Sequence, residues 1–192
     1  MVDQKQSVVT PKRFEQGLTY EQYRSKISKN VEKFQFNYDN TQVSDEDRKA
    51  LRELVARPNG PKKLLVLGED WCPDVYRGMP VLARLAEAAG IVMRVFPRDE
   101  NTDIMNEFLK DGEFQSIPTA VFYTDKFDYI LHFIERPAKA NEEMPQMRAI
   151  IGTRSREEAQ PDIDAFQKGP VWAGWRQATI REISQKLKEK VG

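Results

Sequence analysis

The stretch from Leu64 to Val75 constrains the fold of this chain more than any other. It begins with four consecutive apolar residues, Leu64 to Leu67, and a short apolar run of this kind, followed by a turn signal, predicts a buried strand. Gly68 to Asp70 predict the exit loop of that strand. Cys72, the only cysteine of the protein, follows directly. The stretch therefore predicts a strand-to-helix junction that carries the single thiol of the chain.

Periodic apolar positions after this strand extend the pattern. From Ser44 onward the predicted order is a helix that ends before Arg57, the strand Leu64–Leu67, a helix that ends at Gly90, the strand Ile91–Phe96, a short helix capped by Asn101 or Thr102 that ends at Asp111, and the strands Ala120–Tyr123 and Tyr129–Ile134. The first two strands are joined through a helix and should be parallel, whereas the last two are too close for a crossover and should form an antiparallel hairpin. This order predicts an α/β fold with a mixed central sheet flanked by helices.

The N-terminal extension, residues 1–43, divides into two parts. Residues 1–18 are polar and show no periodicity, so we expect an arm or a strap across the body. From Thr19, which resembles a capping residue, we expect one helix that ends at the turn-forming cluster Asn37–Thr41. Its apolar face packs on the core and is formed by Tyr20, Tyr23, Ile27, Val31 and Phe34.

The C-terminal extension, residues 137–192, has weaker signals. We expect a helix over Ala138–Ile151, with Pro145 at a kink or in its first turn, and then a charged loop over Gly152–Pro161. Lys168–Trp175 is predicted to be irregular, with Trp172 and Trp175 either anchoring it to its own domain, which we favour, or forming a partner surface. Gln177–Lys190 is predicted to be a helix with a polar outer face. We expect residues 1–43, 44–136 and 137–192 to form one compact unit, with self-association through the extensions as a possible homodimer.

Composition excludes several classes of function. The 30 basic side chains balance the 30 acidic ones, so no global field attracts nucleic acid or an anionic membrane. No apolar run approaches the roughly 20 residues of a membrane span. The first 16 residues lack the apolar region of a secretory signal, and we therefore expect a cytoplasmic protein.

Few residues are available for metal or nucleophilic chemistry. One cysteine forms neither an intrachain disulfide nor a metal site with two thiolates. His132, the only histidine, lies within a predicted strand, which favours a surface position on that strand over a pairing with Cys72. The acidic run Asp45–Asp47 follows Ser44 and is typical of a capped helix N-terminus rather than a metal site. We therefore expect no metal and no bound cofactor.

Cys72 is the candidate nucleophile. At a strand-to-helix junction the positive end of the helix dipole and unpaired backbone N–H groups favour the thiolate, and Pro73 reinforces the helix start. Arg77, one turn later, adds positive potential, whereas nearby acidic residues act in the opposite direction. The sign of the net pKa shift stays open at this point. An inert, buried thiol is the alternative.

Two motifs resemble those of the thioredoxin family. Trp71–Val75, with Pro80 in the following helix, is similar to the Trp-Cys-x-x-Cys motif, and Ile117-Pro118-Thr119 before the hairpin resembles the cis-proline loop. The predicted element order over residues 44–136 is also that of the family. The resemblance implies a thioredoxin-like fold with helical N- and C-terminal extensions, a cis Pro118, and Cys72 as nucleophile. It also implies a partner-binding surface that draws on Trp71, Pro73, Asp74, Val75, Arg77, Ile117, Pro118 and Thr119.

The departures from the family pattern limit the chemistry. Val75 stands where the family has its resolving cysteine, and Val66 corresponds to the family's buried acidic residue. The first hypothesis is therefore a monothiol that exchanges with a protein or low-molecular-weight disulfide and needs an external resolving thiol. The second is a redox-silent thioredoxin-fold interaction module. A peroxidase-like use of Cys72 is weaker, because the Thr-x-x-Cys arrangement expected of peroxiredoxin-like sites is missing.

Overall fold

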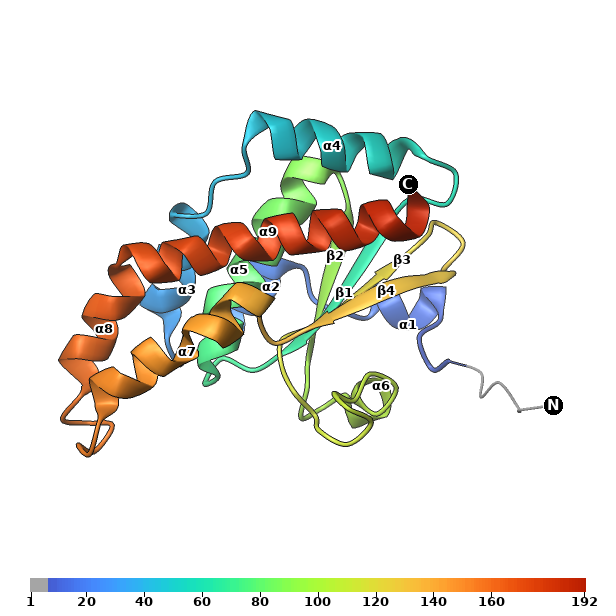
Figure 1. Cartoon of the computed structure of the whole chain (residues 1–192). Coiled ribbons are helices and arrows are strands. Elements are labelled where there is room, and N and C mark those ends of the chain that lie inside the picture. The colour runs from blue at the N-terminus through green and yellow to red at the C-terminus, as the bar shows by residue number, and fades with distance from the viewer. Residues whose placement is uncertain (1–6) are drawn as a thin grey trace.

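The computed structural model describes residues 7–192, and its centre is a four-stranded sheet (Figure 1). The strands are β1 (Lys63–Gly68), β2 (Val92–Pro97), β3 (Thr119–Tyr123) and β4 (Tyr129–Ile134), in the spatial order β2-β1-β3-β4. β1 is parallel to β2 and antiparallel to β3, and β3 forms an antiparallel hairpin with β4. The predicted mixed sheet is thus confirmed. Its register places Val66 opposite Val95 and Ala120.

Helices cover both faces of this sheet. α5 (Pro73–Ala89) packs on β1 and β2, α9 (Pro170–Val191) packs on β4, and the two helices contact each other (Figure 1). α3 (Val31–Asp39) packs against α5, and α4 (Asp45–Ala56) packs against both α5 and α9. α1 (Pro11–Glu15) covers the other face, where the ring of Phe14 lies 5.4 Å from that of Phe127 in the β3–β4 turn. The remaining helices are α2 (Tyr20–Lys26), α6 (Thr102–Met105), α7 (Ala138–Ile151) and α8 (Gln160–Lys168). One hydrophobic core joins residues from both extensions to the sheet.

The N-terminal extension differs from the prediction in three ways. Residues 1–6 lie outside the described part of the chain, and the expected strap contains the short helix α1, whose Phe14 is fully buried. The single helix predicted from Thr19 is wrong, because it is interrupted at residues 27–30. There the Asp70 carboxylate accepts hydrogen bonds from the backbone N–H groups of Ser28 and Lys29, and Asn30 has a left-handed backbone. The capping box of Thr19 with Gln22 is confirmed.

The predicted boundary at Asn37–Thr41 is confirmed, but it lies late in this cluster, since α3 continues to Asp39 and the turn is at Asn40. Asn37 is buried, and its side-chain oxygen accepts hydrogen bonds from Trp172 Nε1 at 3.0 Å and Arg176 at 3.2 Å. A residue type that favours turns is held in a helix by partners more than a hundred positions away. The neighbouring Ser44 caps α4 as predicted, with Oγ accepting from the Asp47 N–H.

The C-terminal extension is more helical than its sequence indicates. α7 has the predicted bounds, with Pro145 in its interior. The segment Lys168–Trp175, predicted to be irregular, contains the end of α8 and the start of α9, because Pro170 occupies the first turn of α9. Trp172 and Trp175 are buried in the protein's own core, as favoured over a partner surface, although on a helix. The short helix predicted after Asn101 is only four residues long and has no side-chain cap from Asn101.

Candidate functional site

β1 places the candidate site at its C-terminal end. Leu64–Leu67 are fully buried, and Gly68 passes so close to α5 that a Cβ there would lie 2.6 Å from Met79 Cε and 2.8 Å from Val75 Cγ1. Cys72 is the N-cap of α5, with Pro73 in the first turn. The Cys72 carbonyl accepts hydrogen bonds from the N–H groups of Val75 and Tyr76. The chain therefore turns sharply from strand to helix with the thiol at the junction.

The Cys72 thiol faces the loop that precedes β3. Its Sγ lies 3.8 Å from the carbonyl oxygen of Ile117, and the Ile117–Pro118 peptide bond is cis, as the family resemblance implies. Pro118 packs against α5, where a Cβ at Gly78 would lie 3.2 Å from Pro118 Cγ. The two motifs that are 45 positions apart in sequence thus meet at one point.

Burial raises the pKa of the Cys72 thiol above its ordinary value, and the Asp74 carboxylate acts in the same direction. The backbone N–H groups of Val75 and Asp74 and the Arg136 guanidinium lower this pKa but do not compensate. The net pKa shift of Cys72, whose sign cannot be decided from the sequence, is therefore upward. At neutral pH the thiol is protonated.

Asp74 is held by two arginines beneath the thiol. Arg136 lies 2.6 Å from Asp74 Oδ2, and Arg77 lies 3.5 Å from Oδ1. Arg77 is fully buried, and it donates to Thr179 Oγ1 on α9 at 3.2 Å and to the Glu135 carbonyl at 3.1 Å. Burial lowers the pKa of Arg77, which Asp74 partly offsets. The arginine thus links the site to α9.

A thioredoxin family model matches residues 17–148, more than half of the chain. The chain belongs to the thioredoxin family.

Two solved structures share the thioredoxin-like fold of the chain. A protein of unknown function from Pseudomonas aeruginosa has a TM-score of 0.63 at 17% identity, and the match covers 92% of this chain and 95% of that chain. An HIV epitope-scaffold has a TM-score of 0.61 at 18% identity with the same coverage. No curated protein shows significant similarity to the chain. At these identities the two structures support the fold alone.

The predicted partner-binding residues of this thioredoxin-family chain lie at different depths. Trp71 is 44% exposed, with the Arg98 guanidinium 5.3 Å from its ring, and Cys72, Pro73 and Asp74 are partly buried. The other predicted side chains are buried, namely those of Val75, Arg77, Ile117, Pro118 and Thr119. The outer surface at the thiol is therefore made by Trp71 and the partly buried Cys72, Pro73 and Asp74, and the buried residues lie beneath it.

Sequence reasoning missed Arg136, which interacts with both Asp74 and the thiol. A signal for it did exist in the predicted hairpin. Because β3 starts directly after the cis-proline loop and pairs antiparallel with β4, the residues that follow β4 return to that loop. The Glu135 N–H donates to the Pro118 carbonyl at 2.8 Å, which confirms this return.

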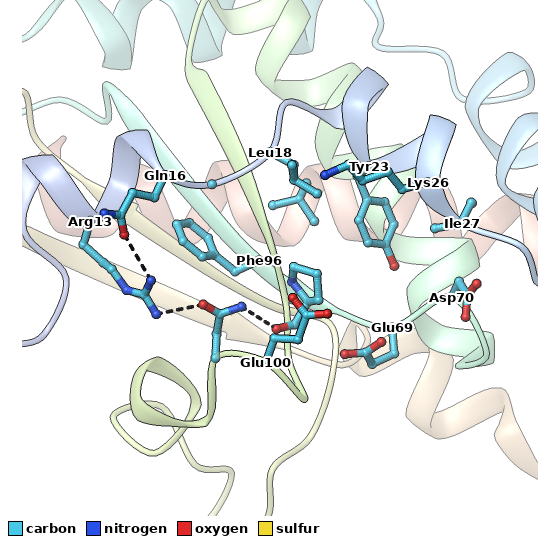
Figure 2. A pocket seen from close by; sticks show the side chains of 14 residues that line it. Arg13, Gln16, Leu18, Tyr23, Lys26, Ile27, Glu69, Asp70, Phe96 and Glu100 are labelled. Carbon is cyan, nitrogen blue, oxygen red and sulfur yellow. Dashed lines mark hydrogen bonds between the residues drawn. The ribbon is translucent and has the colours of Figure 1, made fainter.

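The turn between β1 and α5 faces a pocket of about 410 Å³ on the side opposite to Cys72 (Figure 2). The strap formed by α1 and α2 lines one wall, and the end of β2 with Glu69 and Asp70 lines the other. Burial raises the pKa of Glu69, whose Oε1 accepts a hydrogen bond from the Asp99 N–H at 2.9 Å. No sequence pattern predicts this pocket, because Tyr23 fits the apolar face of a helix and Glu69 fits the exit loop of a strand.

Other candidate groups lie outside the site. His132 is exposed on β4, and its Nδ1 lies 2.8 Å from the Tyr129 hydroxyl, so the predicted surface position is confirmed. Among residues 7–192, no cluster of three or more His, Cys, Asp or Glu side chains is arranged for a metal ion. In the same part of the chain, no helix has the length and apolarity to cross a bilayer.

Proposed function

We propose that the protein carries out thiol–disulfide exchange as a monothiol through Cys72. The observation that carries the proposal is the position of the thiol, at the N-cap of α5 and 3.8 Å from the carbonyl oxygen of the residue before a cis-proline. The family resemblance assigns the nucleophile to this position. The proposed substrates are disulfides of proteins or of low-molecular-weight thiols.

The exchange runs in two balanced steps. The Cys72 thiolate attacks one sulfur of a disulfide R–S–S–R′, so that a mixed disulfide with R forms and R′–S⁻ leaves and takes up a proton. An external thiol R″–SH, as its thiolate, then attacks the R sulfur and releases the Cys72 thiolate. The net reaction converts R–S–S–R′ and R″–SH into R–S–S–R″ and R′–SH.

The second thiol must come from outside the chain. Val75 is fully buried at the position of the family's resolving cysteine, and Cys72 is the only cysteine. A reduced thiol pool such as cytosolic glutathione supplies the resolving thiol, which accords with the proposed cytoplasmic location. The exchange needs no bound cofactor.

The proposed partner docks as an extended segment on the surface formed by Trp71, Cys72 and Pro73. Its backbone pairs with that of Ile117, in the manner of strand addition. The exposed indole of Trp71 supplies apolar contact area beside the thiol.

A redox-silent interaction module is the second candidate, and the raised pKa of Cys72 favours it. In this role the same surface binds an extended peptide without a covalent step. The helical extensions then recruit a partner or a second copy of the chain.

The test is incubation with oxidised glutathione over a pH series, followed by intact-mass spectrometry. We expect one glutathione adduct, absent in C72S, that forms faster as the pH rises. A dithiol thioredoxin serves as the positive control. If the control reacts and Cys72 acquires no adduct at any pH at which the protein stays folded, the monothiol proposal is wrong. Partner capture that is unaffected by C72S then supports the interaction module.

A second variant tests whether the site has thioredoxin-like geometry. V75C restores a Cys-x-x-Cys motif with a small change in side-chain size. We expect it to form an intrachain disulfide and to reduce insulin, with dithiothreitol as the electron source, faster than the native protein, which depends on an external thiol to resolve each mixed disulfide. V75S is the matched control. If V75C stays fully reduced under oxidising conditions that close the disulfide of the dithiol thioredoxin, the nucleophile position is wrong.

A further inference from the structure

The pocket behind the turn between β1 and α5 is built from segments that are distant in sequence. Leu18 forms a bridge to Val95 on β2, and this pairing holds the α1–α2 strap along the free edge of the sheet. Asp70 fixes the end of α2 by accepting hydrogen bonds from Ser28 and Lys29. The pocket of about 410 Å³ between these contacts is thus a preformed cavity.

Tyr23 presents an unused polar group to this cavity. Its side chain is 4% exposed, and its hydroxyl has no hydrogen-bond partner among residues 7–192. Figure 2 shows the hydroxyl pointing into the pocket, on the side where Glu69, Asp70 and Glu100 lie. An unpaired buried hydroxyl costs roughly 1–3 kcal/mol, so a ligand that pairs with it gains affinity.

The charge around Tyr23 is negative. Three carboxylates line the cavity, from Glu69, Asp70 and Glu100. Burial raises the pKa of the Tyr23 hydroxyl, and the carboxylates of Glu69 and Asp70 raise it further. One wall also carries the cations Arg13 and Lys26. Arg13 is already engaged, with a salt bridge to Asp103 at 3.3 Å and a hydrogen bond to Asn101 at 2.8 Å, and Lys26 is solvent-exposed at the edge.

We propose that this pocket binds a primary alkylammonium group. An ammonium has three N–H donors and no acceptor, and Tyr23 Oη with the carboxylates of Glu69 and Glu100 are the acceptors that the cavity offers. Leu18, Phe96 and Pro97 provide apolar surface for an alkyl chain. The site is separate from Cys72 and does not depend on the proposed thiol exchange.

Other ligand classes fit less well. Glu69 and Asp70 oppose an anion. A divalent cation has no suitable site, since the described residues include no metal-ligating cluster. A guanidinium is planar and presents a rigid fork of donors, whereas the acceptors here come from three separate segments, which suits the freely rotating ammonium.

The ammonium has two possible sources, a free aliphatic amine or a lysine side chain of a partner segment. Titrations of isotopically labelled protein by NMR distinguish them, with 1,4-diaminobutane as the free amine and Nα-acetyl-lysine methylamide as the lysine side chain. Butanol and butyrate are the neutral and anionic controls. We expect amide shifts at Lys26, Glu69 and Asp70 with the ammonium probes. Stronger binding of the diamine indicates a metabolite site, and stronger binding of the lysine probe indicates a site for a partner's side chain.

Two variants assign this binding to the pocket, and two others serve as controls. E69Q should weaken ammonium binding about tenfold, because a charge-assisted hydrogen bond becomes a neutral one, and Y23F should weaken it about fivefold. E53Q, which removes an exposed carboxylate on α4, is the matched control and should bind as the native protein does. C72S should also bind normally. The proposal is wrong if neither probe binds at millimolar concentration, if butyrate or butanol shifts the same resonances equally, or if folded E69Q and Y23F bind like the native protein.

Discussion

The two sides of the turn between β1 and α5 differ in how their buried polar groups are paired. On the Cys72 side, Asp74 is paired with two arginines, and Arg77 makes further hydrogen bonds to Thr179 and Glu135. The Nε atoms of Arg77 and Arg136 have no partner within residues 7–192, but both guanidinium groups are held through their other nitrogens. On the Glu69 side, the Tyr23 hydroxyl is buried without a partner within residues 7–192, next to two carboxylates and an open cavity.

This difference indicates which side is built for stability and which is prepared for a ligand. A buried ion pair with additional hydrogen bonds fixes the geometry around it, and removing one member leaves an uncompensated charge. A hydroxyl that has no protein partner makes no hydrogen bond that could stabilise the fold in the way that this ion pair does. We therefore expect mutations on the Cys72 side to change folding and thiol chemistry, and those on the Glu69 side to change binding.

The largest effect should come from Arg77, which is fully buried. R77M keeps much of the side-chain volume but leaves Asp74 with Arg136 alone and leaves Thr179 Oγ1 without this donor. We expect the free energy of unfolding to fall by about 3 kcal/mol, measured by urea denaturation.

R48M is the matched control for R77M, since Arg48 forms only an exposed pair with Asp45 at 3.5 Å. Exposed pairs contribute roughly 0–1 kcal/mol. If R77M is no more destabilising than R48M, the paired network does not stabilise the Cys72 side and the comparison fails.

The next effect concerns the reactivity of Cys72. Because the folded-state pKa is raised, the thiol is protonated at pH 7, and the thiolate fraction increases about tenfold for each pH unit until the pKa is reached. The rate of iodoacetamide alkylation should therefore increase about a hundredfold between pH 7 and pH 9 in the folded protein. In urea the rate should level off at lower pH, because the unfolded thiol has its ordinary pKa.

The same shift has a consequence for stability. Folding favours the protonated thiol, so its contribution is fully present below the ordinary thiol pKa and is lost as the pH rises through the higher folded-state pKa. C72A should lack this decline in the free energy of unfolding. A folded-state alkylation profile that levels off below the unfolded one would show that the pKa is lowered instead.

A smaller and signed effect comes from the two charges that face the thiol. D74N removes a carboxylate that raises the pKa of Cys72, and R136Q removes a guanidinium that lowers it. The midpoint of alkylation should therefore move to lower pH in D74N and to higher pH in R136Q. A general loosening of the site would expose the thiol and move both midpoints downward, so a downward shift in R136Q contradicts the electrostatic interpretation.

The elements that the sequence predicted correctly are those with local causes. The buried run Leu64–Leu67, the short β3–β4 connection and the Ser44 cap depend on neighbouring residues, and all three are present. The missed features have distant causes. α2 and α3 are separated by hydrogen bonds to Asp70, and Asn37 is held in a helix by Trp172.

The candidate site divides in the same way. The cis-proline beside Cys72 is implied by the resemblance of two short motifs to those of the thioredoxin family, and the structure confirms it. The upward shift of the thiol pKa depends on burial by residues from several segments, and the contribution of Arg136 depends on the hairpin register. The cavity at Tyr23 depends on where the α1–α2 strap crosses the sheet, which no local pattern encodes.

The smallest effect, and the sharpest test of the difference between the two sides, is the stability of Y23F. The Tyr23 hydroxyl has no partner in the described chain, so its removal breaks no hydrogen bond and relieves the burial of an unpaired polar group. We expect the free energy of unfolding to change by less than about 0.5 kcal/mol or to increase slightly. Y38F is the control, because the Tyr38 hydroxyl donates to Glu87 at 2.6 Å and its loss should be destabilising. A loss above 1 kcal/mol in Y23F would mean that the hydroxyl serves the fold, and the Glu69 side would then resemble the Cys72 side.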